Sequence, residues 1–154
     1  MKKIYLLLLS IIILSGNLFS QVFNLSPTQH GYIFTDEMSS TIYLFQDDKL
    51  EELVSAPGCG NYFQVSSDGN KVGFKLIEDG IQIPCVIDLN SKTIIRFNDP
   101  VIKCGQVNFD EKNNPAFTID KDLHYIKDGK AYIYHLGYYA NIAPISPNGE
   151  FVVF

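Results

Sequence analysis

Histidine is the side chain best suited to acid–base or metal chemistry near neutral pH, and the sequence has three: His30, His124 and His135. His124 and His135 lie on either side of Asp128-Gly129, a residue pair typical of two-residue hairpin turns. Such a turn places Asp122 opposite His135, with His124 as a diagonal neighbour on the same face. The three side chains suit a metal or acid–base cluster, but an exposed polar hairpin face is the simpler interpretation, and we favour it.

No other stretch carries a recognised catalytic pattern. The sequence lacks a GxSxG elbow, an HExxH helix and a phosphate loop. The acidic stretches "DEKNN" (110–114) and "DKD" (120–122) lack the ligand pattern of a calcium loop and predict solvated turns. The aromatic segment "HLGYYANI" (135–142) suits either a sugar- or peptide-binding rim or an ordinary connection. We therefore predict no catalytic residue, no metal ligand and no cofactor, and the binding residues stay unassigned.

The first twenty residues have the layout of a secretory signal peptide. A basic start, "MKK", precedes an uncharged apolar run over 4–14 and a small, polar stretch over 15–20. The run is short for a membrane-spanning helix, which needs about 20 residues. We expect cleavage near Ser20, although Leu18 is larger than usual at its position, and a secreted or periplasmic protein. An uncleaved signal anchor is the alternative.

The charge balance excludes nucleic acid as a partner. Loss of Lys2 and Lys3 with the leader lowers the 12 basic residues to 10, against 17 acidic residues, so the net charge becomes −7. The remaining lysines are scattered singly, and such a chain repels phosphates.

Four segments of the chain repeat one pattern. They are "LSPTQHGYIF" (25–34), "VSSDGNKVGF" (65–74), "NFDEKNNPAF" (108–117) and "ISPNGEFVVF" (145–154). Each has a polar turn cluster in its middle and closes on Phe, and the closing residues are spaced by 40, 43 and 37 positions. A period of about 40 residues is that of β-propeller blades with four strands each.

Between these phrases the sequence alternates apolar and polar residues, which predicts strands and essentially no helix after the leader. Turns are expected at Asp79-Gly80, Asn90-Ser91 and Asp128-Gly129. In the first unit we expect strands in "YIFTDE", "TIYLFQDD", "KLEELVSA" and finally "NYFQVSS" (61–67). In the second unit the last strand is expected in "CGQVNFD" (104–110).

The repeated phrase resembles the TolB-type (WD-like) propeller repeat, in which a Ser-Pro-Asp-Gly turn leads into an apolar strand. "SPNGEFVVF" matches it closely, "SSDGNKVGF" has Ser67 in place of Pro, and "FDEKNNPAF" has lost both Pro and Gly. The resemblance implies an all-β fold: a partial β-propeller of about three four-stranded antiparallel blades plus the first strand of a fourth. The blades would cover roughly 24–65, 66–107 and 108–145, with the next starting at 146–154, and the strand after each turn would be innermost.

The propeller arrangement gives an expectation for the three cysteines. Cys59 and Cys104 each precede a glycine and the last expected strand of a unit, so they occupy equivalent positions in neighbouring blades. If a disulfide forms, Cys59–Cys104 is the expected pairing; the alternative is that both are small buried apolar side chains. Cys85 is expected to be a buried free thiol.

Function stays open at this stage, because a fold does not imply an activity. We expect a secreted, non-enzymatic β-propeller that binds protein or carbohydrate and meets the membrane only during export. The alternative is the propeller portion of a secreted peptidase or carbohydrate lyase whose catalytic part lies beyond residue 154. Since three blades cannot close a ring, we also expect the chain to be the N-terminal part of a longer protein.

Overall fold

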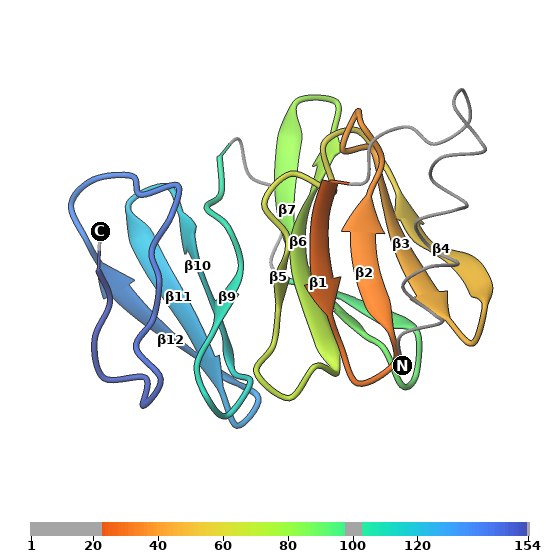
Figure 1. Cartoon of the computed structure of the whole chain (residues 1–154). Helices are drawn as coiled ribbons and strands as arrows, with labels where there is room; N and C mark the ends of the chain where they lie inside the picture. The colour runs from red at the N-terminus through yellow and green to blue at the C-terminus, as the bar shows by residue number, and fades with distance from the viewer. Residues whose placement is uncertain (1–22, 98–102, 154) are drawn as a thin grey trace.

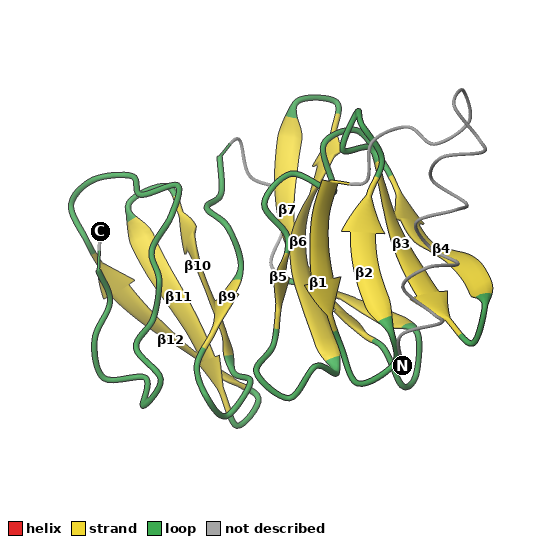
Figure 2. Ribbon diagram, in the orientation of Figure 1, coloured by secondary structure: helices red, strands yellow, loops and turns green. Residues whose placement is uncertain are grey.

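The computed structural model describes residues 23–97 and 103–153, so the predicted leader (1–20) and the last repeat phenylalanine, Phe154, lie outside the described residues. The described chain forms twelve strands in three four-stranded antiparallel sheets (Figures 1 and 2). It contains no helix, and hence none that is long and apolar enough to cross a membrane. The all-β expectation of three four-stranded units is confirmed.

Each sheet is a meander in which strands that follow one another in sequence pair side by side. The first sheet contains β1 (Phe23–Pro27), β2 (Tyr32–Thr35), β3 (Thr41–Gln46) and β4 (Lys49–Ser55). The second contains β5 (Gln64–Val65), β6 (Lys71–Glu78), β7 (Ile81–Asp88) and β8 (Thr93–Arg96). The third contains β9 (Asn108–Phe109), β10 (Pro115–Ile119), β11 (Asp122–Lys127) and β12 (Lys130–His135).

The strands group differently from the sequence-based expectation. The segments over 61–67 and 104–110, expected to end one unit, instead supply β5 and β9, the first strands of the next sheets. The reason is local: each polar turn folds its flanking strands into an antiparallel hairpin, which places both in the same sheet. The strand after the turn is therefore the second of its sheet, and the expectation that it is innermost was wrong. In β6 and β10 this strand is apolar on both faces because both faces pack within the core.

Short turns join most of the outer strands. Asp79 and Gly80 have φ angles of 51° and 78°, and Asp128 and Gly129 have 51° and 72°, so both predicted two-residue turns adopt the left-handed backbone that Asp and Gly tolerate. The predicted turn at Asn90-Ser91 is also present, as the centre of a hairpin loop between Asp88 and Thr93, which pair with each other. The backbone N–H groups of Asn90 and Ser91 donate to the Asp88 carboxylate, which supports a longer loop.

Apolar side chains fill the spaces between the sheets. Buried residues of the first and second sheets form one cluster, to which β2 contributes Ile33 and β6 contributes Phe74. A second cluster joins the second and third sheets through Val86, Val107 and the fully buried Phe117. The phenylalanine of the repeated phrase thus holds neighbouring sheets together.

The polar turn at Ser66 is a closed hydrogen-bond network. The Ser66 hydroxyl donates to Asp68 Oδ1 (2.6 Å) and accepts from the Lys71 backbone N–H (2.9 Å). The Gly69 N–H donates to the Ser66 carbonyl, and Gly69 has a φ of 68°, a conformation that costs glycine little. Serine, aspartate and glycine each have a separate role in this turn.

Two later turns repeat the network with different residues. At the fourth phrase the Ser146 hydroxyl donates to Asn148 Oδ1 (2.7 Å) and accepts from the Phe151 N–H (2.9 Å). At the third phrase Asp110 takes the place of serine, and Asn113, with a φ of 62°, takes the left-handed position of glycine. The phrase that looked degenerate therefore makes the same kind of turn.

The four turns lie along one line, which we call the turn row (residues 28–31, 66–71, 110–114 and 146–151). Each turn is bonded to the next. The bonds are Gln29 N–H to Gly69 O (3.2 Å), Ser67 Oγ to Asn113 Oδ1 (2.9 Å) and Glu111 N–H to Pro147 O (2.8 Å). The row sets the spacing of the sheets at one end of the molecule.

The close approach of the second and third sheets predicts a steric effect at Gly73. A Cβ there would lie 2.7 Å from Val107 Cγ1, so Gly73→Ala should destabilise the fold by about 1–3 kcal/mol through overpacking. Val107→Gly, which removes the obstructing Cγ1 and also Cβ (2.8 Å from the added atom), should offset part of this loss. Urea unfolding of both single variants and the double variant measures the coupling. Simple additivity of the two losses would contradict the proposed contact.

A second prediction concerns Asp110, whose carboxylate accepts a 2.7 Å hydrogen bond from the buried Tyr125 hydroxyl. Burial acts to raise the Asp110 pKa, but hydrogen bonds from Asn114 and Tyr125 outweigh it and the pKa lies below its ordinary value. The resulting stabilisation is present above the unfolded-state pKa of about 3.9 and is lost as the pH falls below it.

Tyr125→Phe should therefore lower the free energy of unfolding at pH 7 by about 1.5–3 kcal/mol. The difference from wild type should shrink toward pH 3, because protonated Asp110 makes a weaker bond. Thermal or urea unfolding across this pH range checks both statements. Tyr132→Phe on the exposed strand β12 is the matched control. If the difference in unfolding free energy between wild type and Tyr125→Phe stays constant with pH, the assigned Tyr125–Asp110 bond is refuted.

Candidate functional site

The predicted histidine hairpin has the register expected from its turn. Asp122 pairs with His135 and His124 pairs with Ile133. His135 Nδ1 lies 2.7 Å from Asp122 Oδ1, and the His135 side chain is 72% exposed. His124 instead stacks on Phe117, with ring centroids 5.6 Å apart, and burial lowers its pKa. The structure thus gives one exposed His135–Asp122 hydrogen bond and one packed ring.

His30 lies elsewhere, in the turn row, with Nε2 2.9 Å from Asn70 Oδ1. Within residues 23–97 and 103–153, no three His, Cys, Asp or Glu side chains gather in a way that could hold a metal ion. The acidic stretch at 110–114 is occupied by its own turn, since the Asp110 carboxylate accepts from Lys112, Asn114 and Tyr125.

The expected Cys59–Cys104 disulfide is absent, because all three thiols are free and buried. Cys59 packs in the core between the first two sheets, where its thiol donates to the Ser40 carbonyl (3.3 Å). Cys104 packs in the core between the second and third sheets. Burial raises the pKa of Cys85 to about 12 and that of Cys104 to about 11, so these thiols stay protonated at neutral pH.

The position after the repeat phenylalanine distinguishes the second sheet from the other two. Thr35 and Thr118 follow Phe34 and Phe117, and both are buried. In the second sheet this position carries Lys75, which is only 8% exposed. A lysine therefore occupies a buried site that holds a small hydroxyl side chain elsewhere in the repeat.

Lys75 extends toward the segments that enter the third and fourth units. The Thr118 hydroxyl donates to the Ala140 carbonyl, and Lys75 likewise donates to the Cys104 carbonyl (3.1 Å) of the segment entering β9. Its longer side chain also reaches Asn141 Oδ1 (3.3 Å) in the segment after β12. One side chain of the second sheet thereby links two later connections.

Tyr139 and Lys103 complete this group on its solvent side. The Tyr139 hydroxyl lies 3.0 Å from both the Cys104 carbonyl and Asn141 Oδ1. Lys103 Nζ lies 3.9 Å from the centroid of the Tyr139 ring, a cation–π contact. Tyr139 is partly buried, whereas Lys103 and Asn141 are exposed. We call Lys75, Lys103, Cys104, Tyr139 and Asn141 the Lys75 cluster.

The electrostatics of the Lys75 cluster favour hydrogen-bond acceptors. Burial lowers the pKa of Lys75, and nearby Lys103 adds to this effect. The ion pairs found among the described residues involve Lys92, Arg96 and His135 but not Lys75. The cluster can donate hydrogen bonds to a bound group and places positive charge beside it.

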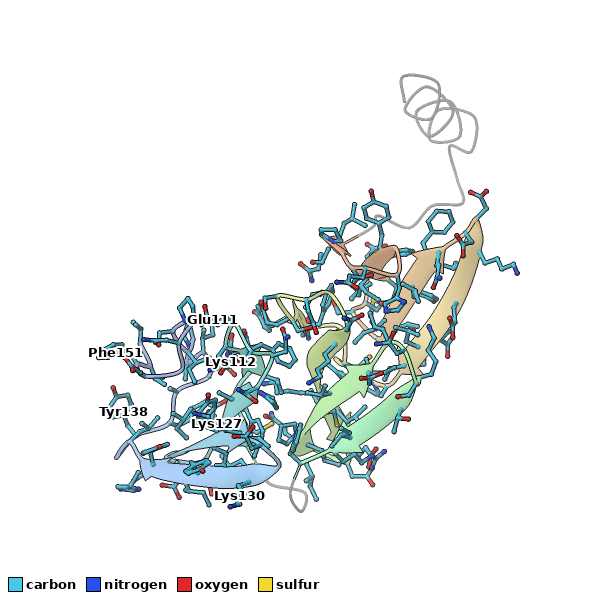
Figure 3. All side chains as sticks on the ribbon, turned by 90° about the horizontal axis from the view of Figure 1, so that it is seen from below. Glu111, Lys112, Lys127, Lys130, Tyr138 and Phe151 are labelled. Atoms are coloured by element: carbon cyan, nitrogen blue, oxygen red, sulfur yellow. The ribbon has the colours of Figure 1, made fainter. Side chains whose placement is uncertain are left out.

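Sequence reasoning singled out one part of this cluster, the segment over 135–142, as a possible binding rim. It missed Lys75, although the aligned phrases carry a signal: Lys75 stands where Thr35 and Thr118 stand in the neighbouring repeats. Tyr138, from the same segment, is 49% exposed. In Figure 3 it lies with Phe151 on the side of the third sheet that faces away from the other two.

The buried position of Lys75 predicts a pH-dependent contribution to stability. Its pKa in the folded protein lies below the ordinary value of 10.5, so between these values the unfolded chain binds more protons. Wild type should gain stability relative to Lys75→Thr as the pH rises from neutrality toward 10.5. Melting temperatures of both proteins over this range test it, with Lys130→Thr as an exposed control. If the difference in melting temperature between wild type and Lys75→Thr stays constant or decreases as the pH rises, the burial of the ammonium group is contradicted.

Comparison with known proteins supports the fold. No protein-family model and no curated protein sequence matches the chain. The structure of TolB from Acinetobacter baumannii aligns with a TM-score of 0.60 and 17% identity, over 85% of this chain and 36% of TolB. The tricorn protease aligns with a TM-score of 0.61 and 13% identity, over 85% of this chain and 13% of the protease.

A putative 6-phosphogluconolactonase from Bacteroides uniformis ATCC 8492 aligns with a TM-score of 0.50 and 11% identity, over 86% of this chain and 46% of that chain. The chain thus spans less than half the length of each of these proteins. At such identities the shared property is the fold. The three sheets are blades, and the chain has the fold of a partial TolB-like β-propeller.

Proposed function

We propose that this chain is a non-enzymatic propeller module that binds a protein or carbohydrate ligand at the Lys75 cluster. The observation that carries the proposal is that the Lys75 ammonium group and the Tyr139 hydroxyl both lie within hydrogen-bond distance of the side-chain oxygen of one exposed residue, Asn141. Loops that connect rigid strands commonly carry binding residues. The proposal includes export, which rests on the leader-like sequence over 1–20 and on the similarity in fold to TolB.

The chemistry of the described side chains favours binding over catalysis. Burial raises the pKa of the Cys104 thiol, so the cysteine in the cluster is a poor nucleophile. The Asp122–His135 pair is exposed at the outer edge of the third blade, on β11 and β12. A nucleophile and its base must lie within hydrogen-bond reach of each other, and the two groups belong to different parts of the blade.

The alternative is that the chain forms the propeller portion of a secreted peptidase or carbohydrate lyase. The fold similarity to part of the tricorn protease favours this reading. In that case the Lys75 cluster would position a substrate whose chemistry occurs on another part of the protein.

Binding can be tested with arrays of defined peptides and oligosaccharides. We expect wild type to retain a subset of ligands and Asn141→Ala to bind them about tenfold more weakly, because hydrogen bonds to a charged group are lost or rearranged. Asn90→Ala, which changes an exposed asparagine on another loop, is the matched control. Equal retention by Asn141→Ala would contradict the assigned site. Cleavage of a retained ligand by wild type would favour the enzymatic alternative.

A further inference from the structure

Lys75 is a buried amine that has no carboxylate partner within the described part of the chain. Its ammonium group has three N–H donors, and two of them are directed to the Cys104 carbonyl and Asn141 Oδ1. Both acceptors are neutral, and no carboxylate of the described chain pairs with Lys75. Burying a cation without a counter-ion is costly, so the arrangement favours an anion.

Gln106 supplies a second donor without an acceptor. Its residue is 5% exposed, and Nε2 is the one buried side-chain nitrogen or oxygen of the described residues that has no hydrogen-bond partner. Buried amide groups are nearly always hydrogen-bonded, which makes this nitrogen an exception that needs an explanation. A ligand oxygen would satisfy it.

The two donors belong to the same neighbourhood. The Gln106 backbone N–H donates to the Asn141 carbonyl (2.8 Å), while Lys75 donates to the Asn141 side chain. Gln106 also follows Cys104, whose carbonyl accepts from Lys75, by two residues. Asn141 and the segment over 104–106 are therefore bonded to the side chain of Lys75, and the same asparagine is bonded to the backbone of Gln106.

We propose that Lys75 and Gln106 bind a carboxylate group of the ligand, which enters past Tyr139 and Asn141. This assignment rests on the proposed binding function and names the chemical class that the site takes. The incoming group must be an acceptor, because the Cys104 carbonyl and Asn141 Oδ1 each already lie within hydrogen-bond distance of two donors.

A carboxylate fits these donors better than a phosphate group does. It carries one negative charge, which matches the single buried ammonium group, and its two oxygens provide one acceptor for Lys75 and one for Gln106. The second cation, Lys103, is exposed and lies against the Tyr139 ring, so it steers an anion toward the entrance. Acidic sugars and acidic peptides both present such a group.

The test uses sodium acetate as the probe and the whole chain as the protein. Acetate should raise the melting temperature of wild type at constant ionic strength and shift the side-chain amide resonances of Gln106. Acetamide, which has the same shape without the charge, should do neither. Lys75→Thr should weaken acetate binding by about tenfold or more, while the exposed control Lys130→Thr should leave it unchanged. Lys75→Thr installs the residue found at the equivalent positions 35 and 118, so it should fold.

Gln106→Leu provides an independent variant. It should fold well, because it removes an unsatisfied buried amide nitrogen, and it should weaken acetate binding. Binding of acetate to Lys75→Thr with unaltered affinity would overturn the proposal. So would an equal response of wild type to acetamide, or stronger binding of inorganic phosphate than of acetate.

The outcome is separable from that of the array experiment. Suppose that the retained array ligands need Asn141 but lack a carboxylate, and that acetate gives no response. This result would refute the carboxylate site and would leave the binding function standing. A Lys75-dependent response to acetate with no retained array ligand would support the site and count against protein or carbohydrate as the natural ligand.

Discussion

The turn row is the constraint on which the arrangement of the blades depends. Apolar packing holds neighbouring sheets together, but it is not directional, and hydrogen bonds between the sheets are needed to fix their relative position. The Ser67–Asn113 and Glu111–Pro147 bonds provide this link at one end. Because the bonded groups lie in tight turns with few accessible conformations, little additional entropy is lost when they join. Apolar packing between the sheets then acts on elements already in register.

The same row explains why one phrase tolerates variation. Its networks need an acceptor side chain at the first position and a left-handed residue near the end. Ser66 and Gly69 meet this requirement in one blade, and Asp110 and Asn113 meet it in the next. What is repeated is the conformation, and several residue types can produce it. Stability in repeated architectures arises largely from such contacts between neighbours.

Much of the fold could be predicted from the sequence because its signals are local. The period of the phenylalanines gave the units, and Asp128-Gly129 gave the register of a whole hairpin. The grouping of strands into sheets was missed because it depends on which neighbour a two-residue strand such as β5 pairs with, which no short stretch encodes. The Cys59–Cys104 disulfide was wrong for a related reason: equivalent positions in adjacent blades can be buried in different cores. Two residues of the candidate site, Tyr139 and Asn141, lie in the segment over 135–142, which the sequence indicated as a possible binding rim. Lys75 was overlooked because a lone lysine in a strand looks solvated.

The burial of Thr35, Lys75 and Thr118 at one repeated position has an evolutionary consequence. This position is enclosed by connections whose backbone carbonyls accept a hydrogen bond from a hydroxyl in one blade and from an ammonium in another. The strand pairing around it does not depend on which donor is present. One residue per blade can therefore change while the strands and their pairing stay the same. Single-codon changes at this position can vary the interior of such a protein, and new binding specificities can arise without a new fold.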